Sequence, residues 1–160
     1  NPRRTVGGII AGPLRLHGFD DVKDRVSQAL SQVGLPLAFR HRFPHELSGG
    51  QRQRVGIARA IATEPEFILA DEIVSGLDVS SQAQVLTLLE RLVAEMGLTV
   101  AFVSHDLSVI RRLCGTTLVL YQGEIVEHAA TADLFAQPQA QYTRDLLDAI
   151  PLPEVNAAWL

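Results

Sequence analysis

The stretch LSGGQRQR, from Leu47 to Arg54, constrains the fold of this chain more than any other segment. Ser48 precedes Gln51 by three positions, which is the spacing of a helix capping box, and apolar residues at helical spacing follow at once. A helix should therefore begin at this serine. Gly49 and Gly50 leave the backbone N–H groups of the first turn accessible, at the positive end of the helix dipole. The pattern fits a capped helix without a ligand as well as a phosphate-binding helix start.

The composition indicates a globular protein of one domain's size. The chain has 160 residues, 47% of them hydrophobic and 20% charged, which is enough for one hydrophobic core. A net charge of −4 argues against a nucleic-acid partner, because no overall positive field would attract phosphates. The single cysteine, Cys114, excludes an internal disulfide and fits a reducing compartment, and its apolar neighbours suggest a buried thiol. No apolar run approaches the roughly 18 residues of a membrane span.

Hydrophobic spacing predicts alternating helices and strands. Residues 1–48 are expected to be largely helical, with the clearest pattern over residues 20–33. The elements expected after them are a helix to Thr63, a strand over Phe67–Ala70, a helix over Ser80–Met96, a strand over Leu98–Val103, a helix over about Leu107–Cys114, a hairpin of 117–121 with 124–128 around Gln122-Gly123, helices over 131–136 and 140–150, and a loosely ordered tail over 151–160. The first two strands are apolar throughout, which is typical of strands buried on both faces. The alternation predicts a parallel sheet of the first three strands in an α/β layer.

Ionisable residues follow both buried strands at the edge where parallel sheets bind ligands. Asp71 and Glu72 end the first strand, and His105 follows the second. Two adjacent carboxylates leaving an apolar strand suit a magnesium nucleotide, with one orienting the metal and the other a water molecule, although an acidic turn without a ligand has the same pattern. His105 and Asp78 are each ambiguous alone, since a histidine can cap a strand and an aspartate commonly starts a helix.

The order and spacing of these segments resemble the ABC ATPase family from about Phe43 to Ala130. The matching motifs, in chain order, are LSGGQRQR, a strand into Asp71-Glu72, Ser75 to Asp78, and a strand into Ser104-His105-Asp106. Two residues depart from the family pattern beside these motifs. Ile73 stands where the family usually has proline, and Gly76 stands where alanine is usual, but neither replaces a catalytic side chain.

The resemblance implies a role for each motif. Ser48, Gly49, Gly50 and Gln51 form the signature motif, which in this family contacts the γ-phosphate of ATP held by the opposite subunit. Asp71 acts on Mg²⁺ through water, and Glu72 polarises the attacking water. The segment from Ser75 to Asp78 corresponds to the D-loop, which crosses the dimer interface. His105 corresponds to the switch histidine that touches the γ-phosphate.

The same resemblance implies that part of the catalytic domain is missing from this sequence. No G-x-x-x-x-G-K-[ST] phosphate loop occurs, and the glutamine of the Q-loop would precede Asn1. The fold class expected is α/β, a partial P-loop NTPase (RecA-like) parallel sheet with an ABC-type helical subdomain, truncated at the N-terminus. The expected divisions are a helical subdomain with the signature motif over 1–63, the later part of the ATPase core over 64–130, and a helical extension and tail over 131–160.

The flanking sequences narrow the resemblance to one group of transporters. Residues 1–18 and 133–151 resemble the ATP-binding subunits of oligopeptide, dipeptide and nickel importers. The expected function is therefore ATP binding and hydrolysis, with Mg²⁺, in an importer of peptides or related small solutes. Expected partners are a second ATPase subunit and transmembrane permeases, at the cytoplasmic face of the cell membrane. Without the phosphate loop, these 160 residues alone are expected to be inactive.

Two alternatives remain open at this point. The first is a soluble ABC ATPase without transport, acting in translation or DNA repair, which the importer-like flanks argue against. The second is a non-catalytic chain that lends its signature motif to a complete partner, which the shared geometry of such sites permits. The transported solute is not expected to touch this subunit, so its identity does not follow from these residues.

Overall fold

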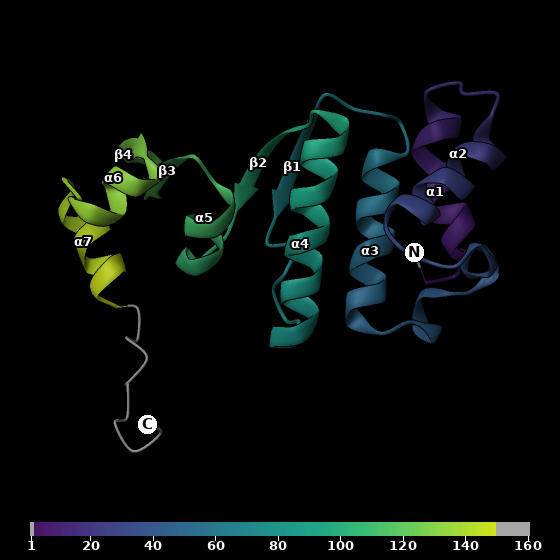
Figure 1. Ribbon diagram of the computed structural model, residues 1–160, viewed down its shortest axis with the longest axis horizontal. Coiled ribbons are helices and arrows are strands. Elements are labelled where there is room, and N and C mark those ends of the chain that lie inside the picture. The colour runs from purple at the N-terminus through teal and green to yellow at the C-terminus, as the bar shows by residue number, and fades with distance from the viewer. Residues whose placement is uncertain (1, 150–160) are drawn as a thin grey trace, which may run out of the picture. The chain divides into compact units, whose positions relative to one another are not determined.

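The computed structural model describes residues 2–149 and divides the chain into two compact units, split between Val103 and Ser104. The first unit holds most of the helices, and each unit is described by itself. Its elements are α1 (Val6–Leu16), α2 (Val22–Gln32), the 3-10 turns η1 (Leu37–His41) and η2 (Pro44–Glu46), α3 (Gly49–Ile61), β1 (Phe67–Asp71), α4 (Val79–Met96) and β2 (Thr99–Val103) (Figure 1).

Helices α1, α2 and α3 form a small bundle at the start of the first unit (Figure 1). Thr5 caps α1 by accepting a hydrogen bond from the N–H of Gly8 at 3.2 Å. Every fourth residue of α1 from Val6 onward is fully buried, and these side chains face the other two helices: Val6, Ile10 and Leu14. The helical character expected for residues 1–48 is confirmed, and the helix expected over residues 20–33 is α2.

Strands β1 and β2 pair in parallel, with Phe67 opposite Thr99 and Asp71 opposite Val103. Both strands were expected from their apolar runs, but the expected burial on both faces is wrong. Phe67 is 57% exposed and Leu69 is 64% exposed, whereas Ala70 is buried. Side chains alternate across a strand, so one face of this pair is covered and the other is open among the described residues. The continuous apolar run could not reveal which face lacks a cover.

Helix α4 lies beside this pair of strands and is the longest element described (Figure 1). It matches the helix expected over Ser80–Met96 and ends at Gly97, whose φ of 64° is the left-handed conformation that glycine favours. Its buried residues form the stripe that the sequence pattern predicted: Val85, Leu86, Leu88, Leu89 and Leu92. None of the helices between residues 2 and 149 is long and apolar enough to span a bilayer.

The second unit contains α5 (Leu107–Leu113), β3 (Thr116–Tyr121), β4 (Glu124–Ala130), α6 (Thr131–Ala136) and α7 (Gln141–Asp148). The expected hairpin is confirmed, since β3 and β4 pair antiparallel across Gln122-Gly123. The expectation that the third strand joins the parallel sheet concerns both units and stays a prediction. Gln122 and Gly123 both have positive φ, 50° and 87°, as a tight two-residue hairpin turn requires. The tail expected over 151–160 lies outside the described residues.

Two side chains in the second unit bear on expectations from the sequence. Cys114 is half-buried, not fully buried, and this burial raises the pKa of its thiol. Thr117 and Thr131 are both buried and join their hydroxyl groups at 2.8 Å, which fastens β3 to the start of α6. Leu134 of α6 is 2% exposed and belongs to the core of this unit.

Candidate functional site

Helix α3 begins at the capping box that the sequence predicted. The N–H of Gln51 donates to Ser48 Oγ at 3.3 Å, and the N–H of Ser48 donates to Gln51 Oε1 at 3.0 Å. Gly49 and Gly50 are the first helical residues, so no carbonyl of α3 itself lies behind their N–H groups. These groups point from the positive end of the helix dipole, which is suited to an anionic oxygen.

The two glycines also have a packing role that the sequence did not indicate. A Cβ atom on Gly49 would lie 3.2 Å from Leu77 Cδ2. A Cβ atom on Gly50 would lie 3.3 Å from the Oγ of Ser81 and 3.4 Å from its Cβ. Both approaches are tighter than ordinary contacts between carbon atoms. The glycines therefore let the start of α3 pack directly against Leu77 and the first turn of α4.

Asp78 caps the neighbouring helix α4. Its carboxylate accepts the N–H of Ser81 at 2.9 Å and the hydroxyl of the same serine at 2.7 Å. Both hydrogen bonds lower the pKa of Asp78 below the ordinary value of 3.8, and the bond from the Ser81 hydroxyl has the larger effect. The structure thus brings together two capped helix starts, at Ser48 and at Asp78, which lie thirty residues apart in the sequence. Motif spacing alone did not show that they are adjacent.

Asp71 and Glu72 lie at the carboxyl end of β1, and both side chains are exposed. The N–H of Glu72 donates to the carbonyl of Val103 at 2.9 Å and continues the sheet by one bond. Glu72 has a φ of 47°, the left-handed conformation that residues with a Cβ atom rarely adopt. Residues held in such conformations are enriched at functional sites, although Glu64 and Gln122 of this chain also have positive φ. The chain then turns through Gly76, whose φ of 72° explains glycine at a position where the family usually has alanine.

His105 follows β2 and belongs to the second unit, where its side chain is exposed. Its neighbours fix the local backbone: the N–H of Asp106 donates to Ser104 Oγ at 3.0 Å, and Asp106 caps α5 through the N–H of Ser108 at 2.9 Å. The expected approach of His105 to Asp71 and Glu72 crosses from one unit to the other and stays a prediction.

The donor chemistry at the end of β1 fits magnesium only in part. Within residues 2–149, no group of three or more His, Cys, Asp or Glu side chains gathers as a ready-made metal site. Mg²⁺ in nucleotide sites is commonly held by one or two carboxylates together with phosphates of the substrate. Asp71 and Glu72 supply two exposed carboxylates of this kind, so the residues fit an ion that arrives with a nucleotide.

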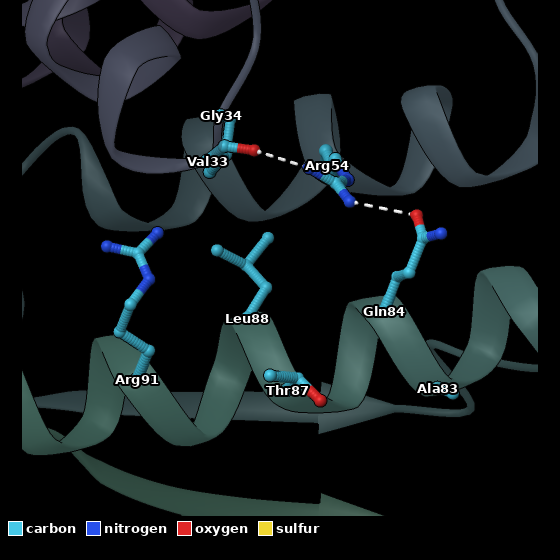
Figure 2. Close-up of a pocket in the computed structure, with 8 residues that line it drawn as sticks. All are labelled: Val33, Gly34, Arg54, Ala83, Gln84, Thr87, Leu88 and Arg91. Carbon is cyan, nitrogen blue, oxygen red and sulfur yellow. Dashed lines mark hydrogen bonds between the residues drawn. The ribbon is translucent and has the colours of Figure 1, made fainter.

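An open groove of about 320 Å³ begins at the two helix starts and extends along α3 and α4. It is lined by Ser48, Gln51, Arg54, Ser81 and Gln84 among others. A second hollow, of about 420 Å³, continues past Arg54 to Arg91 (Figure 2). Arg54 and Arg91 are functional candidates that sequence reasoning did not single out. The only signal for Arg54 was its place at the end of the LSGGQRQR stretch, and Arg91 carried no signal at all.

Comparison with known proteins shows what this chain resembles. The family model described as ABC transporter matches residues 1–75. The chain is 51% identical, over 98% of its length, to a Brucella ovis protein named for peptide import and ATP binding. It is 49% identical over 96% of its length to the oligopeptide transport ATP-binding protein OppF of Bacillus subtilis. A solved structure of a metal-chelate type ABC transporter, in an inward-facing conformation, matches with a TM-score of 0.74 and 32% identity, covering 81% of this chain and 53% of that one.

The chain is therefore similar to ABC transporter proteins, and the family model covers its first 75 residues. It spans about half the length of the curated relatives it matches, 50% for the Brucella protein and 52% for the Bacillus protein. The expected fold class is confirmed as mixed α/β with a parallel strand pair, similar to the ABC transporter of known structure.

Proposed function

We propose that this chain is part of the ATP-binding and ATP-hydrolysing subunit of an ABC importer for peptides or related small solutes. The observation that carries the proposal is the adjacency of the α3 and α4 starts, where Ser48–Gln51 and Asp78 are brought together by close packing at Gly49 and Gly50. The names of the relatives, which describe peptide import and oligopeptide transport, support the substrate class.

In this proposal the residues divide the work of phosphoryl transfer. The N–H groups of Gly49 and Gly50, with the Ser48 hydroxyl, bind the γ-phosphate of ATP held by a second subunit. Gln51 completes the capping box that holds this segment, and Asp78 lies at the interface between the two subunits. Bound Mg²⁺ would neutralise charge that develops on the transferred phosphate. Asp71 would hold that ion through water.

Glu72 would orient and polarise the attacking water, because its carboxylate follows directly after Asp71 and its backbone is held in one unusual conformation. His105 would donate a hydrogen bond to the γ-phosphate. The phosphates also require a cradle of backbone N–H groups and a lysine, and the one lysine of this sequence, Lys23, is not in such a motif. The 160 residues by themselves should therefore neither bind ATP tightly nor hydrolyse it.

The whole importer subunit would act peripherally at the cytoplasmic face of the cell membrane. ATP would close two such subunits, and hydrolysis would reopen them and drive transport through separate permease subunits. A transport role is favoured over translation or DNA repair by the names of the relatives.

ATP hydrolysis by the full-length subunit tests the proposal. Glu72→Gln should lower kcat at least a hundredfold while leaving ATP binding intact, since the amide keeps the shape but not the charge that polarises water. Glu66→Gln is the matched control, because Glu66 is an exposed glutamate just before the other end of β1. Equal loss in both variants, or turnover by the purified 160 residues that Glu72→Gln abolishes, would contradict the assignment.

A further inference from the structure

The C-terminal end of α2 shows how the first unit is held together. A helix leaves its last four carbonyl groups without partners in the helix. Two of them are satisfied locally by a Schellman motif: the N–H of Leu35 donates to Leu30 and the N–H of Gly34 to Ser31, each at 2.9 Å. Gly34 has a φ of 69°, as this motif requires. The other two carbonyls, of Gln32 and Val33, need partners from elsewhere.

Two arginines from other helices supply those partners. Arg54 of α3 donates from Nη1 to the carbonyl of Val33 at 3.2 Å, and Arg91 of α4 donates from Nη2 to the carbonyl of Gln32. The last turn of α2 itself contains no basic residue, so these side chains bring the only cations recorded at its negative end within the described residues. Figure 2 shows both guanidinium groups directed into the hollow next to Val33 and Gly34.

Arg54 also joins α3 to α4. Its Nη2 donates to Gln84 Oε1 at 3.1 Å, so one planar guanidinium bridges α2 and α4 at once (Figure 2). A Cβ atom on residue 34 would lie 3.2 Å from Arg54 Nη1, which is a tight approach, and the φ of 69° itself favours glycine at this position. Arg91 is held in turn by an ion pair with Glu95 at 2.9 Å. We call Arg54, Gln84 and Arg91 the arginine clamp.

The clamp acts on the same two helices that begin at the candidate site. Arg54 and Gln84 lie less than two turns from the N-caps of their helices, Ser48 and Asp78. The groove of about 320 Å³ opens between them, so apolar packing does not fill this part of the helix pair. The hydrogen bond from Arg54 to Gln84 is therefore placed to set the rotation of α3 against α4, and the bond to Val33 ties this arrangement to the end of α2.

We propose that Arg54 is a positioning residue, which, with Gln84 and Arg91, fixes the Ser48–Gln51 segment beside Asp78 in the geometry that ATP hydrolysis needs. The inference rests on the proposed ATPase function, and it adds to that function a residue that does not touch nucleotide. A substitution in the clamp shifts the phosphate-binding N–H groups without removing any of them.

A double-mutant cycle tests the clamp without reference to activity. Arg54→Met, Gln84→Met and the double variant are compared in urea unfolding of this chain, with Arg59→Met as the control because Arg59 is exposed on the same helix. Arg54→Met should destabilise the chain, lowering the ratio of folded to unfolded molecules about tenfold. The effects of the two single variants on this ratio should differ from additivity by several-fold in the double variant. Additive effects, or an equal loss in the control, would overturn the clamp.

Steady-state ATP hydrolysis by the full-length subunit tests the positioning role. Gln84→Met should lower kcat about tenfold per folded molecule with KM for ATP within twofold, because the misplaced segment acts on the transition state and not on nucleotide capture. Gln84→Glu keeps an acceptor for Arg54 and should restore kcat. Wild-type kcat in Gln84→Met would overturn the positioning role. If the unmodified subunit hydrolyses no ATP, the proposed function fails, and the unfolding cycle still decides whether the clamp exists.

Discussion

At the scale of single residues, Glu72 shows how chemistry and backbone strain meet in one position. Its carboxylate is the candidate for polarising water, yet its φ of 47° is a conformation in which a Cβ atom costs free energy. A glycine would satisfy the backbone and a glutamate would satisfy the chemistry. The presence of glutamate indicates that the side chain, and not the turn, determines the residue type.

Comparison of Glu72→Gly with Glu72→Ala measures this strain. Both variants lose the carboxylate and whatever it contacts, so they differ only in the Cβ atom. The glycine variant should be more stable than the alanine variant by about 1 kcal/mol in urea unfolding, because glycine adopts positive φ without penalty. An alanine variant as stable as the glycine variant would show that the left-handed conformation at residue 72 is not strained.

At the scale of elements, the start of α3 combines helix capping with the proposed binding of phosphate. Ser48→Ala removes the capping box and should cost about 1 kcal/mol of unfolding free energy. Ser48→Asp keeps a capping oxygen, so its stability should stay close to that of the unmodified chain. Its added negative charge should nevertheless suppress ATP hydrolysis by the full-length subunit, because it repels the γ-phosphate. Equal ATPase activity in Ser48→Asp would mean that this helix start only caps α3.

Helix α7 depends on a cap from another element. Its N-cap, Ala140, has no side chain for this role, and Glu127 of β4 accepts the N–H groups of Gln139 at 2.9 Å and Ala140 at 3.0 Å. The Gln139 N–H is the largest cause that lowers the pKa of Glu127 below its ordinary value of 4.5. A group with a lowered pKa stabilises the fold above its unfolded value and loses this effect as the pH falls through the folded value.

The packing of α7 should therefore weaken as the pH falls below 4.5. The rings of Tyr121 and Tyr142 lie 4.2 Å apart, so near-ultraviolet circular dichroism of tyrosine reports whether α7 stays packed on β3. The signal of the unmodified chain should decline in this range, while Glu127→Gln should show a smaller signal at neutral pH and less change with acid. An identical pH profile in both proteins would contradict the role of Glu127.

Elements with strong local signals were predictable, and those that depend on distant partners were not. The helix start at Ser48, the end of α4 at Gly97 and the hairpin at Gln122-Gly123 follow from cap and turn chemistry written in adjacent residues. The open face of β1 depends on which layer of the fold covers the strand, and adjacent residues do not encode this. The Arg54 contacts join residues 21 and 30 positions apart and had no local signature.

At the scale of the whole molecule, the exposed face of β1 distinguishes this chain from a complete α/β layer. Leu69 is 64% exposed, whereas Leu92 of α4 is fully buried. In the 160 residues alone, Leu69→Ala should therefore cost less than about 1 kcal/mol, while Leu92→Ala should cost about 2–5 kcal/mol. Urea unfolding of the two variants measures the difference. Equal costs would show that Leu69 is covered in solution.

The central claim is that the start of α3 binds ATP held by another subunit. ATP-dependent dimerisation of the full-length subunit tests it most directly, with Glu72→Gln present to prevent hydrolysis. With ATP present, sedimentation should show dimers of the Glu72→Gln variant. The double variant, which carries Ser48→Asp as well, should stay monomeric because a carboxylate at residue 48 repels the phosphate. If the Glu72→Gln variant and the double variant dimerise with equal affinity in ATP, the claim is contradicted.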